Sequence, residues 1–496
     1  MDEVLQTFQS LQGEFEDLIL RGLRVAGAER AGPLSSLAGE LQSAGAAHLA
    51  GKLESLADGL RTDSRDAATS LLGAQATLRL LERVLTLEAA ADQLDSLLAS
   101  ADPAGIPAAA TPAVGGGLSL SPAAPIQLSS ADTKTLLQLL EKLQRGVENL
   151  ILAGLTAASD ATRQTIDLAF REASRMRLLR LGSTLRVATE ELGRFTRNEA
   201  EFSKQRLSFF LNRAWMLARG IGRAVQAGDQ AGLARLAGAQ GTTRVPRLEM
   251  VTLGVAKKFV PRTFCAFDFR LRPVGASAAE LGHRPLIWSS VFPVKPDVEI
   301  PAEGYLHLPQ KQKFKAVQLL EGKRIVLENV TLSGDASPLR IQMGDDTKLT
   351  LGDPFGDWSS FGQWDPQAAR RRLDRHEHHP LDLEVELQEE VLLDSWELGE
   401  PEARGRDGQL AYPLVYRGVV LEAVVSKGDE GDALRKSLEQ LRTAKTRPPL
   451  FALMHYERCR LVCQPLALLE SGGPKHLMLS TENIDRAKLL KALKIV

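Results

Sequence analysis

The chain has 496 residues, of which 44% are hydrophobic and 25% are charged, and its formal net charge is −1. This composition excludes a fully disordered, a collagen-like and a disulfide-stapled protein, and the length predicts about two to four domains. A net charge near zero gives no reason, over the whole chain, to expect nucleic acid or an anionic membrane as a partner.

The first 20 residues carry five acidic side chains, which fits neither a secretory signal nor a mitochondrial transit peptide. No uninterrupted apolar stretch reaches the roughly 20 residues that cross a bilayer, so no membrane partner is expected. Cys265, Cys459 and Cys463 are few and odd in number, which is typical of a reducing compartment. Together these features predict a cytoplasmic protein. Cys459, Leu461 and Cys463 are expected to share one face of a core strand.

Leucines indicate helices in the first part of the chain. Leu49, Leu53, Leu56 and Leu60 recur at steps of three and four residues, with polar residues between them. Residues 1–98 therefore predict a helical bundle. Leucines in residues 132–240 recur at the same steps, which predicts a second helical bundle there.

The two predicted bundles look like copies. Residues 16–23 read EDLILRGL and residues 148–155 read ENLILAGL, with six of eight positions identical at an offset of 132. The same offset pairs Leu49 with Leu181, and a related register continues over about 70 residues. The sequence therefore predicts a duplication, with residues 99–131, rich in Pro, Gly and Ala, as the flexible linker.

Charge distinguishes the two copies. Residues 1–130 hold 8 basic and 16 acidic side chains, residues 131–244 hold 18 and 11, and the remainder holds 35 of each. One interpretation is that the acidic and basic copies dock on each other or are simply solvated. In a second interpretation, the basic copy binds an acidic protein partner. In a third, residues 131–244 bind nucleic acid. The partner-binding candidates in this copy are Arg171, Arg175, Arg206 and Arg213.

From residue 245 the pattern changes to short β-branched and aromatic runs bounded by Pro and Gly. We expect a β-rich module at 245–365 and an α+β module at 380–496 that contains a helix at 432–444. The fold class is thus duplicated all-α bundles followed by an α+β half with mainly antiparallel sheets. Strands are expected at 248–255, 264–271, 285–294, 324–332, 339–343, 348–351, 381–393, 412–426, 450–457, 461–468 and 476–480.

Four aromatic residues cluster in one turn-rich segment, 353–366, which reads DPFGDWSSFGQWDP. They are Phe355, Trp358, Phe361 and Trp364. Such a loop either folds its aromatic side chains onto its own domain as a plug or anchors a partner, because Trp and Phe dominate interface hot spots. We take the four as further partner-binding candidates.

Residues 370–379 combine four arginines with His376, His378 and His379. On a strand, Asp374, His376 and His378 would share one face and could bind a metal. The spacing matches no familiar zinc motif, and Pro380 follows directly. The segment therefore favours a solvated connector, and no metal site is predicted.

Asp297, Glu321 and Lys323 resemble the acidic and basic set of a metal-dependent nuclease superfamily. Gly322 places a turn where that family requires a strand, so this remains the third hypothesis. The chain contains no phosphate-binding loop of the Gly-Lys-Ser/Thr type, no dinucleotide fingerprint and no nucleophile elbow. No cofactor is predicted, and a non-enzymatic role is favoured.

The repeat EDLILRGL and ENLILAGL, with the C-terminal segment PPLFALMHYERCRLVCQPLALL, resembles accessory proteins of bacterial multi-component systems. Those systems are built around MoxR-type AAA ATPases and von Willebrand A-domain partners. The resemblance implies an interaction or scaffold role beside other proteins, an ATPase complex among them, and it carries over no functional residue. A nucleic-acid-binding factor and a nuclease-like enzyme are the alternatives.

Overall fold

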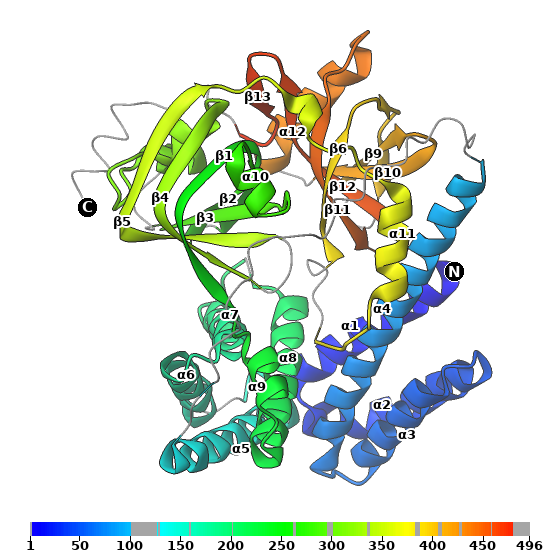
Figure 1. Ribbon diagram of the computed structural model, residues 1–496. Helices are drawn as coiled ribbons and strands as arrows, with labels where there is room; N and C mark the ends of the chain where they lie inside the picture. The colour runs from blue at the N-terminus through cyan, green and yellow to red at the C-terminus, as the bar shows by residue number, and fades with distance from the viewer. Residues whose placement is uncertain are drawn as a thin grey trace. The chain divides into compact units, whose positions relative to one another are not determined.

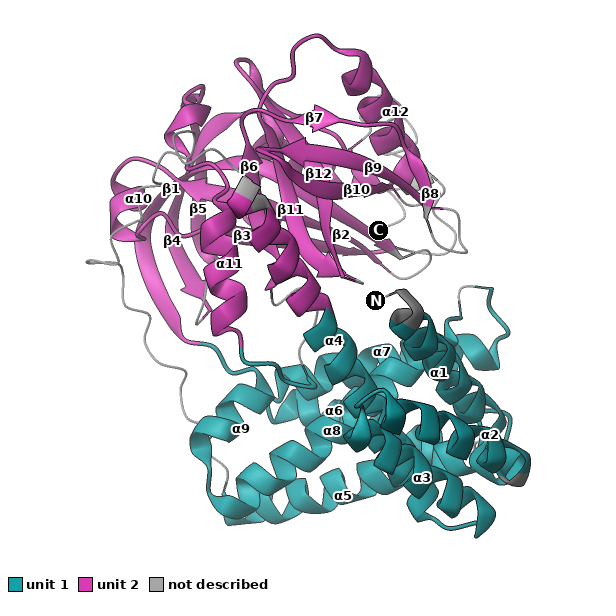
Figure 2. Cartoon of the chain, turned by 90° about the vertical axis from the view of Figure 1, so that its right-hand side faces the viewer, with its two compact units in different colours: residues 1–85, 123–240, 377–383 teal, residues 86–122, 241–376, 384–496 magenta. Residues whose placement is uncertain are grey.

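The chain forms two compact units in the computed structural model (Figure 2). The helical unit comprises residues 1–85, 123–240 and 377–383, and the β unit comprises residues 86–122, 241–376 and 384–496. A helical half precedes a sheet-rich half, which confirms the predicted order of fold classes. The structure describes residues 2–100, 126, 129–157, 160–200, 202–260, 264–294, 301–334, 338–381, 387–404, 409–425, 429–457 and 459–479.

The helical unit consists of two successive sets of helices (Figure 1). The first set is α1 (Asp2–Arg21), α2 (Leu23–Ser43), α3 (Ala47–Arg61) and the first part of α4 (Asp66–Ser100), which continues into the β unit. The second set is α5 (Ser130–Ala153), α6 (Asp160–Arg175), α7 (Leu179–Thr196) and α8 (Lys204–Ala227), and α9 (Gln230–Ala237) follows. Among the described helices, none is both long and apolar enough to cross a membrane.

Some element bounds follow the offset of 132 residues: α1 ends at Arg21 and α5 at Ala153, and α3 and α7 begin at Ala47 and Leu179. Others differ by a few residues, since α1 begins at Asp2 and α5 at Ser130. Most of the predicted linker, residues 101–125 and 127–128, lies outside the described residues.

Two glycines at equivalent positions meet in the helical unit. Gly22 follows α1 with φ +90° and Gly154 follows α5 with φ +82°. A Cβ on Gly22 would lie 2.5 Å from the carbonyl of Ala153, and a Cβ on Gly154 would lie 2.4 Å from the carbonyl oxygen of Arg21. The Leu155 N–H donates to the carbonyl of Leu20 at 3.1 Å, which joins the two chain segments. Only glycine combines this backbone conformation with this close approach.

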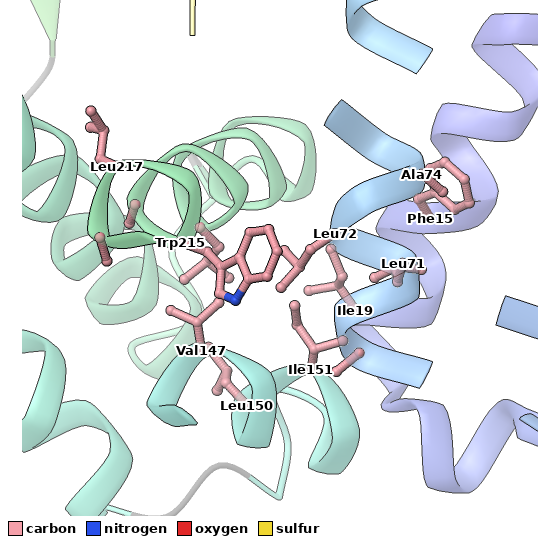
Figure 3. Packing of buried hydrophobic residues seen from close by; sticks show 14 of the residues in the cluster. Phe15, Ile19, Leu71, Leu72, Ala74, Val147, Leu150, Ile151, Trp215 and Leu217 are labelled. Atoms are coloured by element: carbon pink, nitrogen blue, oxygen red, sulfur yellow. The ribbon is translucent and has the colours of Figure 1, made fainter. Parts of the chain in front are cut away.

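One continuous apolar core joins both sets of helices. Figure 3 shows Trp215 of α8 beside Val147 and Ile151 of α5, with Ile19 of α1 and Leu72 of α4 next to them. The leucines at steps of three and four residues face this core, because a helical period of 3.6 brings them onto one side. The spacing that predicted the helices therefore also builds the core.

The first part of the β unit is a closed five-stranded barrel. Its order is β1-β2-β3-β5-β4: β1 pairs with both β2 and β4, and β3 runs parallel to β5. This is the strand order of an OB-fold barrel. The strands are β1 (Thr242–Val260), β2 (Phe264–Pro273), β3 (Leu286–Pro293), β4 (Lys323–Ser333) and β5 (Leu339–Pro354), with helix α10 (Ala276–Glu280) between β2 and β3.

Alternating residues fill the barrel interior. Phe267 and Phe269 of β2 point inward beside Trp288 of β3, and all three belong to one buried cluster. Two 3₁₀ helices, η1 (Ala302–His307) and η2 (Ala316–Leu320), add Leu306, Leu319 and other side chains to this cluster.

The second part of the β unit is an eight-stranded sheet in the order β6-β11-β12-β10-β9-β7, with β13 beside β12 and β8 beside β9. Within this sheet, β10 and β12 are the only parallel pair among the described strands. Helix α12 (Asp429–Thr443) packs Leu434 and Leu438 onto it, and it follows β10 and precedes β11 close to the predicted helix at 432–444. The strands are β6 (Glu389–Leu393), β7 (Glu397–Leu398), β8 (Glu402–Arg404), β9 (Gln409–Tyr416), β10 (Val419–Val425), β11 (Leu450–Glu457), β12 (Arg460–Glu470) and β13 (Gly473–His476).

Several boundaries differ from the prediction. The run 412–426 is two strands, because Arg417 and Gly418 both adopt positive φ and form a two-residue hairpin loop. The runs 339–343 and 348–351 are one strand, β5. Cys459 has φ +60° in the turn before β12, so it does not share a strand face with Cys463.

The segment read as a solvated connector is largely helical. Helix α11 (Pro366–Arg375) begins with Asp365 as N-cap and Pro366 in its first turn. Asp365 and Pro366 thus form a helix start signal directly before the arginine run.

The barrel and the sheet share a third buried cluster. Val251 and Leu253 on the outer side of β1 contact Leu466 of β12 and Phe451 of β11 in that cluster. A Cβ on Gly254 would lie 2.7 Å from Phe451 and 2.9 Å from Leu466. The missing side chain at Gly254 therefore allows the two sheets to approach.

Gly254→Ala is expected to destabilise the β unit by about 1–3 kcal/mol, because both neighbours are fully buried and must shift. Urea unfolding followed by tryptophan fluorescence measures this, since four of the five tryptophans lie in the β unit. Gly352→Ala in β5 is the matched control, because its Cβ would meet Arg324 at an ordinary 3.5 Å. An equal effect of the two substitutions would contradict the packing argument.

Candidate ligand groove between helices α5 and α8

A groove of about 550 Å³ lies between α5 and α8 in the helical unit. Helix α5 begins after Ser129, whose hydroxyl caps the Asp132 N–H, and α8 begins after Ser203 in the same way. The volume falls within the range of about 300–1,000 Å³ that is typical of ligand sites. The groove is lined by Ser130, Thr133, Lys134, Leu137, Gln138, Leu140, Glu141 and Gln144 of α5 and by Arg219, Gly222, Arg223 and Gln226 of α8.

Three exposed cations define the charge of the groove: Lys134, Arg219 and Arg223. Within the described residues, no ion pair joins them to a carboxylate. Glu141, the acidic residue of the lining, is already paired with Arg145 at 2.5 Å. The groove therefore carries positive charge that the helical unit does not neutralise locally.

Arg219 is held in place by an aromatic neighbour. Its guanidinium carbon lies 5.2 Å from the ring centroid of Trp215. The Trp215 indole N–H donates to Glu148 of α5 at 2.9 Å, which fixes the ring. The cation at the groove wall is thus positioned before any ligand arrives.

The floor of the groove is partly apolar. Leu137 is half-buried and Leu140 is buried. The position of Gly222 has room for a methyl group, because a Cβ there would meet Leu140 at 3.9 Å, an ordinary van der Waals contact. Cations above an apolar floor suit a ligand that carries both carboxylates and apolar side chains.

The predicted arginines lie elsewhere in the helical unit. Arg171 and Arg175 are exposed on α6 and pair with Asp167 at 2.6 Å and Glu172 at 2.9 Å. The hydrogen bond to Glu172 raises the pKa of the Arg175 guanidinium. The two ion pairs are exposed and join neighbouring turns of one helix, and such pairs contribute little to the stability of the fold.

Arg206 belongs to a buried charge network between α7 and α8. The Glu191 side chain is 1% exposed, and its Oε1 accepts from Arg194 at 2.7 Å and forms an ion pair with the Nε of Arg206, also at 2.7 Å. Its other oxygen accepts the Ser203 N–H at 3.0 Å, at the start of α8. Arg206 therefore helps to join two helices.

Arg213 is buried, with 4% exposure, and donates to the carbonyl oxygen of Leu381. Leu381 belongs to residues 377–383, the segment of the later chain that returns to the helical unit, and its side chain lies in the helical core. Arg213 thus binds the backbone of a segment that lies much later in the same chain.

The aromatic candidates lie inside the β unit. Phe355 and Trp358 are 8% and 5% exposed and pack with Phe361 in the cluster shared by the barrel and the sheet. The Trp358 N–H donates to the Glu470 carbonyl at 2.9 Å, and that of Trp364 donates to Glu389 at 3.1 Å. This placement fits the plug alternative, and a partner-anchoring role for the loop stays a prediction.

The metal and nuclease hypotheses gain no support. In the described part of the chain, no group of three or more His, Cys, Asp or Glu side chains is arranged to hold a metal. Glu321 and Lys323 are exposed and pair with each other at 2.8 Å. Asp297 lies outside the described residues.

The partner-binding candidates predicted from the sequence did not include Lys134, Arg219 or Arg223. At about 100° per residue, Arg206 and Arg213 fall on one flank of the core stripe of α8, and Arg219 and Arg223 fall on the other. A helical projection of α8 would have separated the two flanks. It would not have identified α5 as the helix beside Arg219.

Comparison with known proteins assigns no family: no protein-family model matches the chain, and no curated protein matches it in sequence.

Proposed function

We propose that the chain is a non-enzymatic interaction component of a cytoplasmic multi-protein assembly, and that its helical unit binds a protein partner. The observation that supports this is the groove between α5 and α8, where Lys134, Arg219 and Arg223 surround an apolar floor. A protein surface with complementary carboxylates would gain both association rate and specificity from these cations. The resemblance to accessory proteins makes an AAA ATPase assembly the first partner to examine.

A duplication would explain why the helical unit has this form. The matching ends of α1 and α5, the matching starts of α3 and α7, and the reciprocal contact of Gly22 with Gly154 support two copies of one ancestral set of helices. In this proposal the second copy gained one groove cation where the first is acidic, since position 134 is Lys and position 2, at the offset of 132, is Asp, and gained Arg219 and Arg223 where the first has Leu87 and Ala91. The copies then serve different partners on one scaffold.

Co-purification tests the proposed function. The tagged full-length chain, purified from its native cells after mild cross-linking, is expected to retain a defined set of proteins. Each retained protein should co-elute with the recombinant full-length chain on size exclusion when the two are co-expressed. The proposal fails if no protein is retained above the level of the tag alone.

A second candidate function is nucleic-acid binding through residues 131–244. The barrel follows these residues in the chain, and its strand order favours nucleic-acid binding by the chain as a whole, because OB-fold barrels often bind oligonucleotides, although a fold alone does not assign a function. This candidate predicts that the full chain shifts a labelled oligonucleotide at low salt, with affinity falling linearly on a log–log plot against salt concentration. Absence of any shift at low salt removes it.

A further inference from the structure

We infer that the groove between α5 and α8 binds an acidic amphipathic helix of a protein partner. This inference rests on the proposed function and specifies the ligand of the same groove. Three features of the groove support it: its shape, its charge spacing and its apolar floor.

The shape suits a helix. The lining residues of α5 recur at three- and four-residue steps from Ser130 to Gln144, which span about 20 Å of helix axis. Those of α8 cover about 10 Å, from Arg219 to Gln226. A partner helix of three to four turns laid along α5 would contact both walls, as in other helix-in-groove complexes.

The charges are spaced like the carboxylates of a helix. Arg219 and Arg223 are four residues apart, so their Cα atoms are separated by about 6 Å along α8. Two Glu or Asp residues four apart on a partner helix have the same separation. Lys134 on the opposite wall offers a third contact.

The floor distinguishes this ligand from nucleic acid. Leu137, Leu140 and the open position at Gly222 favour apolar side chains, which a phosphate backbone does not supply. None of the lining side chains is aromatic, whereas single-strand recognition relies on aromatic stacking. The groove therefore favours a peptide helix over an oligonucleotide.

The test measures binding of a fluorescein-labelled designed helix to the full-length chain by fluorescence anisotropy. The peptide carries Glu at positions four apart on one flank and Leu and Ala on the adjoining face. A peptide with Lys in place of Glu and a labelled single-stranded oligonucleotide are the comparison ligands. We expect the Glu peptide to bind, the Lys peptide not to bind, and the oligonucleotide not to compete.

Two variants test the charge and the floor separately. Arg219→Glu with Arg223→Glu should weaken binding of the Glu peptide by about tenfold or more. Lys142→Glu with Arg186→Glu makes the same charge change at exposed residues outside the groove, and should alter binding by less than about twofold. Gly222→Leu fills the floor without a charge change and should weaken binding by a similar factor. Gly222→Ala should not weaken it, because its Cβ fits.

Several results overturn the inference. These are no binding of the Glu peptide, equal weakening by both charge variants, unchanged binding to Gly222→Leu, and displacement of the peptide by the oligonucleotide. Circular dichroism of each variant shows whether α8 is intact. If a partner co-purifies equally with the wild-type chain and the Arg219→Glu, Arg223→Glu variant, the proposed function stands and the groove inference fails. If no partner co-purifies at all, the proposed function itself fails.

Discussion

Gly22→Ala and Gly154→Ala are each expected to destabilise the helical unit by about 3 kcal/mol or more. Each new Cβ would lie within 2.7 Å of backbone atoms of the opposite segment, which cannot rotate away as a side chain can. Each substitution would also force a residue with a side chain into a positive φ. Urea unfolding followed by circular dichroism at the helical band measures the loss.

The reciprocal contact of Gly22 with Gly154 also predicts the stability of the double variant. Because either alanine already separates the two segments, the double variant should lose less stability than the sum of the single variants. Gly13→Ala in α1 is the matched control: nothing lies within 4 Å of its Cβ, so alanine should stabilise the helix by about 0.5–1 kcal/mol. Additive losses, or a loss at Gly13 as large as at Gly22, would refute the contact.

Glu191→Ala is expected to cost the helical unit about 3–5 kcal/mol, because it removes one partner of a buried charge network. Arg194, which is 5% exposed, loses a charged partner, Arg206 loses its contact across the two helices, and the Ser203 N–H loses its acceptor. The same unfolding measurement applies.

Glu141→Ala is the matched control for Glu191→Ala. Its pair with Arg145 also joins neighbouring turns of one helix, but both side chains are mostly exposed, so its loss should cost less than about 0.5 kcal/mol. Glu191→Gln keeps the shape and some hydrogen bonds, and should lie between the two. If Glu191→Ala and Glu141→Ala cost the same, burial does not strengthen the network.

The helices were predictable because their spacing recurs over many turns. The steps between Leu49 and Leu60 place four leucines on one face, and all four lie in the core of the helical unit. Gly22 and Gly154, which the offset of 132 residues pairs, each directly follow the end of a helix. Local pattern and tertiary packing agree in this part of the chain.

The sheets were predicted less well, because a strand run has few residues and its limits depend on turns. The division of 412–426 depends on Arg417 accepting a positive φ, which its residue type does not suggest. The closed barrel also depends on pairings such as that of β1 with β4, more than 70 residues apart, which no local spacing encodes.

Of the candidate site, only the sign of its charge could be predicted from the sequence. The basic character of residues 131–244 was visible in the sequence, but which arginines remain available depends on tertiary neighbours. Arg206 meets a buried Glu191 and Arg213 a carbonyl from residue 381, whereas Arg219 and Arg223 line a groove. Counting charges along the chain cannot separate these cases.

The contact between Arg213 and Leu381 has a consequence for synthesis of the chain. The helical unit includes residues 377–383, so its last segment is translated after the whole barrel. More than a hundred residues are translated after α9 before Leu381, so Leu381 can join the core of α1 to α9 only late in synthesis. For the same reason, a chain truncated after residue 240 would contain every helix of this unit and still lack part of its packing.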